Sequence, residues 1–570
     1  MPGNPHPSAD PVGRRFEYQG ATGTVRFRGP VAGAPGEWYG VEWDDISRGK
    51  HDGSKGSVRY FTARAPTAGS FLRVGVPLNW GSEFLEAVVR KYLITADRRI
   101  AHHAPETLLR IGRVAELVAR YRMELAASKD QATDGSTAPP HPSSPLVLGD
   151  TTIPLEAVGW DQAEFKFSQV DKLKTISLAH QGIVSAGDAT AIAEVCTDTE
   201  ELDLSNNLFT DWTEIMTIAR ALPRLRVLRL NGNRFDPALI MRPGAGPVDH
   251  IRTLTLNRTG LTWAAVADIV RHTQGLEELS VAFNGMDHLE LETAGPSLVD
   301  DNLRTYLGTL RHLSLEGNAL TNWANVAPLG SLPSLASLSL ARNRLTSVAR
   351  PTTEAPFARL AVLNIDGNCI DQLAAAGNAL DLFPSLHSLR FKNNPAFTEY
   401  SADRIRLELV CRVGRLETVN GSPLNPRERT DLERYYLKQI GETLPTQDEE
   451  AIIQLHPRYR ALVALHGAPV TRAPTTTGRA LGGRLLDITV RTGDPAKADD
   501  GGGLRRQVLP TMTVGNLLAR SARLLELTSP ARLYLVSPSQ PDPVPLEDEF
   551  APISDYGLQA GDQVVVTPLS

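Results

Sequence analysis

The sequence predicts a multidomain protein with three folded parts: a small all-β barrel near the N-terminus, an α/β solenoid in the middle and a small α+β domain at the C-terminus. Three observations carry this prediction. Glycines and aromatic residues gather within residues 12–76, a leucine-rich pattern recurs from residue 173 to about 396, and apolar runs surround one amphipathic segment in residues 484–570. At 570 residues the chain is long enough for several domains.

Composition narrows the class of partner. Hydrophobic residues make up 41% of the chain and charged residues 22%, which is ordinary for a soluble globular protein, and the net charge of −6 argues against a general nucleic-acid binder. Residues 12–76 hold ten Lys and Arg against six Asp and Glu, a net +4, which leaves −10 for the remainder. A basic module on an acidic chain fits an acidic partner for that module alone. No apolar run reaches the length of a membrane span, so no membrane partner is expected.

The chain lacks the motifs of common catalytic and cofactor sites. Its three cysteines, Cys196, Cys369 and Cys411, form no CxxC pair and have no neighbouring histidine motif. The glycine triplet at 501–503 is not followed by the Lys and Ser or Thr of a phosphate-binding loop. We therefore expect no enzyme, no cofactor and no metal site. The few cysteines and a start without an apolar signal segment indicate a cytoplasmic setting.

The most informative stretch of the N-terminal part reads Gly-Lys-His-Asp-Gly over residues 49–53. Gly49 and Gly53 permit positive φ or a close approach of the backbone, and Lys50 places a flexible cation between them. Trp38 precedes the stretch and Phe71 follows it. This combination suits an acidic peptide end with an aromatic residue, whose carboxylate meets Lys50 and backbone N–H groups while its ring packs on Trp38 and Phe71.

With these residues, positions 12–76 resemble a CAP-Gly domain, a module that reads the acidic-aromatic C-terminal tails of α-tubulin and of end-binding proteins. The most frequent form of its motif has Asn where this chain has His51. The resemblance implies that Lys50 and Arg73 form ion pairs with carboxylates of the tail, and that His51 and Asp52 orient the loop. The residues that it implies for tail binding are Trp38, Gly49, Lys50, His51, Asp52, Gly53, Phe71 and Arg73.

Two segments separate this module from the middle of the chain. Residues 79–126 have helical periodicity and are predicted to form a helical connector. Residues 127–150 are rich in Ser, Thr, Pro and Gly, and we interpret them as a flexible linker. The module is then expected to be tethered without a fixed orientation.

Nine copies of the pattern L-x-x-L-x-L-x-x-N-x-L define the middle of the chain, within a domain at 151–440. They follow each other at 25 or 26 residues, except for one interval of 34 that we interpret as an inserted loop. Alternate apolar residues of each strand should point inward, and an amide at the Asn position can satisfy backbone groups between turns. The pattern predicts a leucine-rich-repeat horseshoe, capped near residues 400–440 by a helix, a short strand and a second helix.

The outward strand residues of the repeats should line a concave, protein-binding face. They are small or polar and do not identify a partner. The candidates are Asp203, Arg229, Thr255, Ser314 and Ser339.

The remaining residues are interpreted as a linker at 441–483 and a folded unit at 484–570. Apolar runs at 485–490 and 506–509 bracket a Gly- and Asp-rich turn, a helix is expected from Thr513, and further strands are expected at 533–536 and 563–566. The unit resembles a ubiquitin-like (β-grasp) domain. Since the chain ends without Gly-Gly, we expect it to dock on partners rather than to be conjugated.

The order of the three modules resembles the tubulin-folding cofactor E family. That resemblance implies a tubulin-folding chaperone that captures α-tubulin through its acidic C-terminal tail and its body. With the tubulin cofactors B, C and D it would assemble or dissociate the αβ-tubulin heterodimer, in the cytoplasm and in association with the cytoskeleton. The alternative is a microtubule plus-end or tubulin-tail-binding adaptor without chaperone activity.

Overall fold

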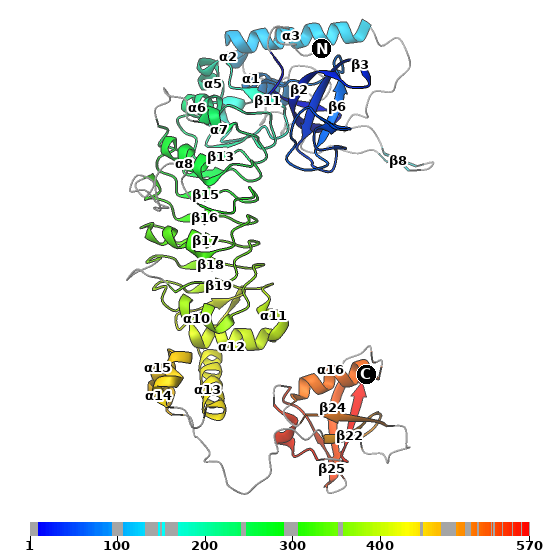
Figure 1. Cartoon of the computed structure of the whole chain (residues 1–570), viewed down its shortest axis with the longest axis vertical. Coiled ribbons are helices and arrows are strands. Elements are labelled where there is room, and N and C mark those ends of the chain that lie inside the picture. The colour runs from blue at the N-terminus through cyan, green and yellow to red at the C-terminus, as the bar shows by residue number, and fades with distance from the viewer. Residues whose placement is uncertain are drawn as a thin grey trace. The chain divides into compact units, whose positions relative to one another are not determined.

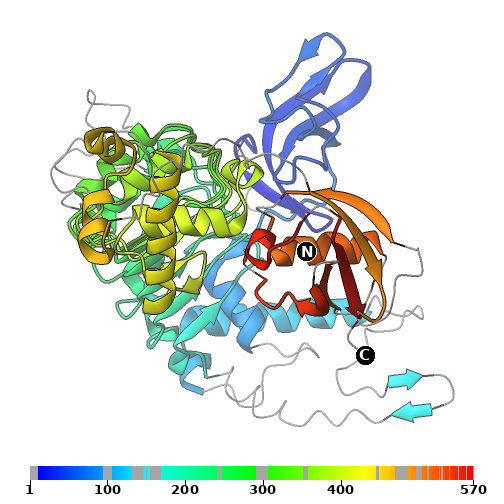
Figure 2. The same ribbon diagram turned by 90° about the horizontal axis from the view of Figure 1, so that it is seen from below.

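The computed structural model divides the chain into two compact units, Met1–Val470 and Thr471–Ser570. Figure 1 draws both, and Figure 2 views the repeats of the first unit end-on. The structure describes residues 10–93, 106–130, 146–148, 151–153, 169–240, 247–289, 306–350, 357–444, 448–468, 486–495, 503–509, 512–525, 527, 531–537, 540–549, 551–559 and 561–568. Most of the linker predicted at 127–150 and nearly all of the inserted loop in the long repeat interval lie outside these residues.

The N-terminal domain is built on an antiparallel sheet with the strand order β1-β2-β3-β6. Because side chains alternate along a strand, the sheet has two apolar faces. One buries Phe16, Val25, Val41 and Trp43, and the other carries a smaller cluster around Phe61. The strands are β1 (Arg15–Tyr18), β2 (Ala21–Val31), β3 (Ala34–Trp43) and β6 (Gly69–Arg73), with a hairpin of β4 (Ser54–Lys55) and β5 (Val58–Arg59) between β3 and β6.

The segment predicted as a helical connector at 79–126 contains helices, and it also caps the solenoid. Strand β7 (Ser82–Glu83) pairs in parallel with β11 (Ile183–Ser185), and α1 (Phe84–Val88) and η1 (Val89–Leu93) are buried in the core of the repeats. Helices α2 (Glu106–Leu109) and α3 (Gly112–Asp130) follow, and α3 adds Val114 and Leu117 to that core. The first repeat of a solenoid needs such a cover for its apolar end.

The barrel is therefore not held by a free tether. Glu17 and Asn79 exchange two backbone hydrogen bonds at 2.8 and 2.9 Å, and Ser82 N–H donates to the carbonyl of Gly182 at 2.9 Å. Only Trp80 and Gly81 separate these two backbone contacts, and Trp80 itself packs on Phe16 of the barrel. In place of the expected long tether, the described residues have a short junction with contacts on both sides.

All nine strands predicted from the repeat pattern are present, each in register with the next. The ladder asparagines bridge neighbouring turns as predicted: Asn207 Nδ2, for example, donates to the carbonyls of Leu178 and Leu204 at 2.9 Å each. The sheet runs through β10 (Thr175–Ser177), β12 (Glu201–Asp203), β13 (Val227–Arg229), β14 (Thr253–Thr255), β15 (Glu278–Ser280), β16 (His312–Ser314), β17 (Ser337–Ser339), β18 (Val362–Asn364) and β19 (Ser388–Arg390), and ends with β20 (Thr418–Val419) and β21 (Ser422–Pro423).

Short helices lie along one side of this strand ladder (Figure 1). Several begin with a side-chain cap, as where Asp188 accepts from Thr190 and Ala191 N–H. They are η2 (Val170–Lys172), α5 (Ala189–Val195), α6 (Trp212–Ala221), α7 (Pro237–Ile240), α8 (Trp263–His272), η3 (Trp323–Asn325), η4 (Ala327–Ser331) and α10 (Leu373–Leu380). A separate hairpin joins β8 (Leu146–Leu148) to β9 (Thr151–Ile153).

The C-terminal cap of the solenoid is larger than predicted. The expected helix, strand and helix are present as α12 (Ala402–Arg412), β20 and α13 (Pro426–Thr443), preceded by α11 (Ala396–Glu399). The linker predicted from residue 441 is wrong in its first part, which forms α14 (Glu449–Leu455) and α15 (Tyr459–His466). Ile452 and Leu462 pack against Leu407 and Tyr436.

The second unit has the β-grasp arrangement predicted for it. Its sheet has the order β23-β22-β26-β24-β25, with β22 and β26 parallel at the centre. Strand β25 was not predicted because its sequence alternates with proline, which is tolerated on an edge strand. The elements are β22 (Leu486–Thr492), β23 (Leu504–Val508), α16 (Val514–Leu524), β24 (Ala531–Ser537), β25 (Gln540–Pro545), η5 (Ile553–Tyr556) and β26 (Gln563–Pro568). None of the helices described in either unit is long and apolar enough to cross a membrane.

Candidate functional site

The Gly-Lys-His-Asp-Gly loop is fastened to the start of β6 by its own backbone. Lys50 and His51 N–H both donate to the carbonyl of Gly69, at 2.7 and 3.2 Å, and Gly69 N–H donates to the carbonyl of His51 at 2.7 Å. These N–H groups are therefore engaged inside the loop. The expectation that backbone N–H groups here meet a ligand carboxylate needs correction for Lys50 and His51.

The two glycines let the loop lie close to its own chain rather than to a ligand. A Cβ on Gly49 would lie 2.3 Å from the carbonyl oxygen of Thr67. Gly53 has φ +100°, and a Cβ there would lie 2.0 Å from the carbonyl oxygen of Phe61. Both positions require glycine for the loop to form.

His51 and Asp52 hold the loop in shape. Nδ1 of His51 accepts a hydrogen bond from Gly53 N–H at 3.0 Å, and its ring lies 4.7 Å from that of Phe71. Burial lowers the pKa of His51 below its ordinary value. The Asp52 carboxylate accepts from Ser54 N–H and pairs with Arg59 at 2.7 Å, and the hydrogen bond from Arg59 lowers its pKa.

The remaining predicted residues share one face of the sheet. Trp38 and Arg73 are direct cross-strand partners, and the Arg73 guanidinium lies 5.5 Å from the Trp38 ring centre. Phe71, two residues earlier on the same face, contacts Tyr60 and Phe61 at 5.4 and 5.9 Å between ring centres. In the described part of the chain, the exposed ammonium of Lys50 forms no hydrogen bond or ion pair, so a cation is left available on the loop whose His51 ring lies against Phe71.

A second feature, which the sequence did not reveal, is a cleft between the barrel and the solenoid. Its volume is about 690 Å³, and its walls include Arg26, Glu42 and Arg64 from the barrel and Arg234 and Gly260 from the repeats. The two most distant of these residues, Arg26 and Gly260, lie 234 positions apart in the chain. No local pattern marks them, since Arg234 simply follows a ladder asparagine.

Asp44 is the centre of the charges behind this cleft. Arg15 donates to its two carboxylate oxygens at 2.8 and 2.5 Å, Thr22 donates at 2.6 Å, and Nε of Arg234 lies 3.7 Å away. Burial raises the pKa of Asp44, but the hydrogen bonds and charge of Arg15 outweigh burial and lower the pKa to about 2. The carboxylate is therefore ionised and links barrel to solenoid.

The candidate residues of the concave face form a continuous row. Asp203 lies opposite Arg229 on the neighbouring strand, and Arg229 lies opposite Thr255. Ser280 follows on the next strand, and then come Ser314 and Ser339, which lie opposite each other. Neighbours in such a row lie roughly 4.8 Å apart. Arg229 also contacts Glu201 at 3.2 Å. The row is half-buried and presents mainly hydroxyl groups to a partner.

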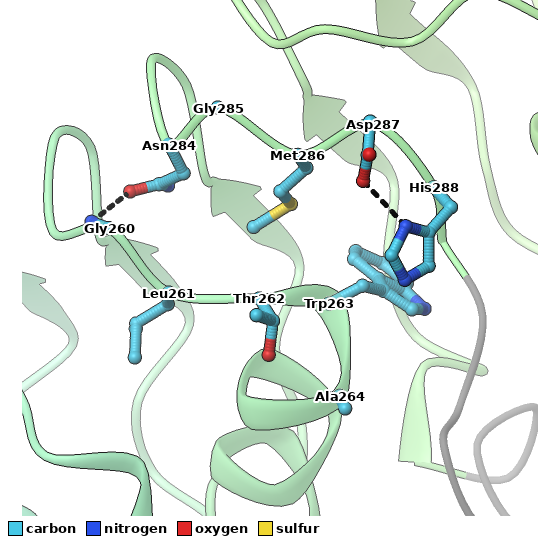
Figure 3. A pocket seen from close by; sticks show the side chains of 10 residues that line it. All are labelled: Gly260, Leu261, Thr262, Trp263, Ala264, Asn284, Gly285, Met286, Asp287 and His288. Carbon is cyan, nitrogen blue, oxygen red and sulfur yellow. Dashed lines mark hydrogen bonds and ion pairs between the residues drawn. The ribbon is translucent and has the colours of Figure 1, made fainter. Parts of the chain in front are cut away.

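A small cavity of about 90 Å³ lies between two successive repeats (Figure 3). Asn284 Oδ1 accepts from Gly260 N–H at 2.8 Å on one side, and Asp287 pairs with His288 at 2.5 Å on the other. Ligand pockets usually measure about 300–1,000 Å³, so this gap is too small for a substrate.

Two of the three cysteines are buried and unsuited to act as nucleophiles. Burial raises the pKa of Cys196 to about 12 and raises that of Cys411 as well, which disfavours the thiolate. Across the described ranges, no group of three or more His, Cys, Asp or Glu side chains could hold a metal ion.

Three comparisons place the chain among known proteins. A family model for the CAP-Gly domain matches residues 12–75. Tubulin-specific chaperone E of Bos taurus is 30% identical, over 98% of this chain and 99% of its own length, and tubulin-folding cofactor E of Arabidopsis thaliana is 29% identical, over 95% and 94%. Among solved structures, the C-terminal ubiquitin-like domain of mouse tubulin-specific chaperone E is 23% identical and covers 17% of this chain and 95% of its own, with a TM-score of 0.14.

Proposed function

The chain belongs to the tubulin-specific chaperone E family, and we propose that it captures α-tubulin and, with the tubulin cofactors B, C and D, assembles or dissociates the αβ-tubulin heterodimer. The observation that carries this proposal is identity of 30% along nearly the whole length of a relative with that name. The chain is a tubulin-folding chaperone by family, and we expect it to act in the cytoplasm without catalysing a reaction of its own.

The acidic tail of α-tubulin is assigned to the barrel. Lys50 supplies a free ammonium at the Gly-Lys-His-Asp-Gly loop, and Trp38, Phe71 and Arg73 supply an aromatic surface with a second cation. A terminal carboxylate and an aromatic ring match these two features. His51 and Asp52 support the loop through its backbone and do not need to touch the ligand.

The body of tubulin is assigned to the concave row from Asp203 to Ser339. Such a surface of hydroxyls with few charges suits a folded protein whose contacts are many and individually weak. Because barrel and solenoid are directly joined, a tail bound at Lys50 holds the body near this row. The second contact then becomes intramolecular, which raises its effective concentration.

The experiment that tests the function is reconstitution with purified components. The chain is mixed with αβ-tubulin and the other cofactors, the complexes are weighed by native mass spectrometry, and heterodimer dissociation is followed by exchange of labelled subunits. Discrete complexes with soluble tubulin and accelerated exchange are expected. Co-sedimentation with microtubules, without soluble complexes or exchange, would instead identify a plus-end or tail-binding adaptor.

A further inference from the structure

The cleft between barrel and solenoid collects more positive than negative charge. Arg26, Arg64 and Arg234 line it, against Glu42 and Asp236, and Arg15 and Asp44 behind it cancel each other. The excess is thus 3 − 2 = +1. Glu42 is shared, since Arg26 Nε lies 2.7 Å from one of its oxygens and Arg64 Nε lies 3.6 Å from the other.

Arg234 is the least compensated of these cations. Its Nε is buried and, within the part of the chain that the structure describes, donates no hydrogen bond, because Asp44 at 3.7 Å is beyond hydrogen-bond distance. Burial, and after it repulsion from Arg64, lowers the pKa of Arg234. Gly260 leaves room for the guanidinium, since a Cβ there would lie 2.8 Å from its Nη1. An anion in the cleft would offset the repulsion between Arg64 and Arg234.

The cleft is continuous with the Lys50 loop. Thr62, Ala63 and Arg64 line it and also line a second, open cavity of about 440 Å³ whose other walls include His51 and Asp52. The Lys50 N–H donates to the Gly69 carbonyl, and Gly69 lies opposite Glu42 on the neighbouring strand. Glu42 in turn forms ion pairs with Arg26 and Arg64. Two such strand-to-strand steps span roughly 10 Å, or about three residues of extended peptide.

We propose that this cleft binds the acidic segment that precedes the terminal residues held at Lys50, so that a Glu- and Asp-rich peptide runs from the Gly-Lys-His-Asp-Gly loop past Arg64 to Arg234. The occupant is a peptide rather than a small anion, because the cleft volume of about 690 Å³ exceeds what a single anion fills and the cleft shares Thr62, Ala63 and Arg64 with the cavity beside the loop. The proposal rests on the tail-binding function of the loop and adds a subsite to which the solenoid contributes.

Three synthetic peptides test this on the full chain by calorimetry. The short peptide is Glu-Glu followed by a C-terminal aromatic residue. The long peptide adds a run of about six Glu upstream, which extends roughly 20 Å, and the neutral peptide has Gln in place of that run. The long peptide should bind more tightly than the neutral one, and its affinity should fall more steeply with added salt.

Single substitutions then locate the extra affinity. Arg234→Gln and Arg26→Gln should each weaken the long peptide about three- to tenfold and leave the short peptide unchanged. The control for Arg26 is Arg28→Gln, since Arg28 lies on the same strand, is similarly exposed at 41% against 46%, and pairs with Glu37 outside the cleft. The control for Arg234 is Arg224→Gln, whose partner is Asp198. Neither control should alter binding of any peptide.

The outcomes separate this inference from the function on which it rests. Lys50→Ala should weaken all three peptides; if it does and the arginine variants do not, the tail site stands and the cleft subsite is overturned. Equal affinity of the long and neutral peptides would overturn it as well. Limited proteolysis shows whether Arg234→Gln releases the barrel from the solenoid. If it does, Arg26→Gln becomes the test of the subsite, because the ion pair of Arg26 lies within the barrel. Unchanged binding of the long peptide to Arg26→Gln would then mean that the arginines only hold barrel and solenoid together.

Discussion

The N–H of Gly53 donates a hydrogen bond to Nδ1 of His51 at 3.0 Å. An acceptor nitrogen cannot carry a proton, so this hydrogen bond of the loop forms only when His51 is neutral and has its proton on Nε2. Asparagine, the usual residue of the related motif at this position, offers its Oδ1 for the same bond. The histidine therefore replaces a fixed acceptor by one that titrates.

Acidification should weaken tail binding. Burial lowers the pKa of His51 in the folded loop below the 6.5 of an exposed histidine, so the unfolded loop takes up protons first. The stability of the loop is complete above that value and is lost as the pH falls below it toward the folded pKa. Calorimetry with the short peptide from about pH 7.5 to about 5.5 should show falling affinity, while Glu side chains remain mostly ionised over this range.

The matched variant for this prediction is His51→Asn. It keeps an acceptor for Gly53 and removes the titration, so its affinity should stay nearly level across the same pH range. A decline as steep as that of the wild-type chain would show that His51 is not the titrating group.

Lys50→Ala should weaken binding of an acidic-aromatic tail peptide about tenfold or more, because a charge-assisted contact at a partly exposed site is worth roughly 1–3 kcal/mol. Lys55→Ala is the control: Lys55 is an exposed lysine of the nearby β4 hairpin. Calorimetry of both variants decides, and wild-type affinity for Lys50→Ala would show that the tail binds elsewhere.

Gly81→Ala should loosen the barrel from the solenoid. Gly81 has φ +90°, and a Cβ there would lie 2.5 Å from both the Gly182 carbonyl oxygen and Val184 Cγ1, so β7 would be pushed from β11. Gly75→Ala is the control, with φ +104° and open space around its Cβ. It carries only the left-handed strain of about 1–2 kcal/mol. Hydrogen exchange at Ser82, whose N–H donates to the Gly182 carbonyl at 2.9 Å, should rise in Gly81→Ala alone.

Ser314→Arg combined with Ser339→Arg should abolish heterodimer exchange while leaving affinity for the tail peptide unchanged. The two serines are direct partners on β16 and β17, so two long side chains would cover the C-terminal end of the concave row. Ser331→Arg, an exposed position on η4, is the control. Full exchange activity of the double variant would remove the concave row from the tubulin-body site.

Much of the fold was predictable because its determinants are local. The inward leucines and ladder asparagines repeat at nearly constant spacing, and each repeat satisfies its neighbour through the same bonds, as Asn343 and Asn368 do for their preceding turns. The β-grasp unit was predictable except for β25, whose prolines conceal an edge strand. The helices α14 and α15 were missed because their stabilising contacts come from distant Leu407 and Tyr436.

The sequence by itself determined the three modules, the register of the concave row and the residues of the Gly-Lys-His-Asp-Gly loop, since these depend on side-chain period, turn glycines and short-range hydrogen bonds. Only the tertiary structure decided that the segment after the barrel caps the solenoid, and that Arg234 comes within 3.7 Å of Asp44. Those relationships arise from covering the apolar end of the first repeat and from pairing charges across an interface. Both are energies between segments far apart in the chain, which no local pattern records.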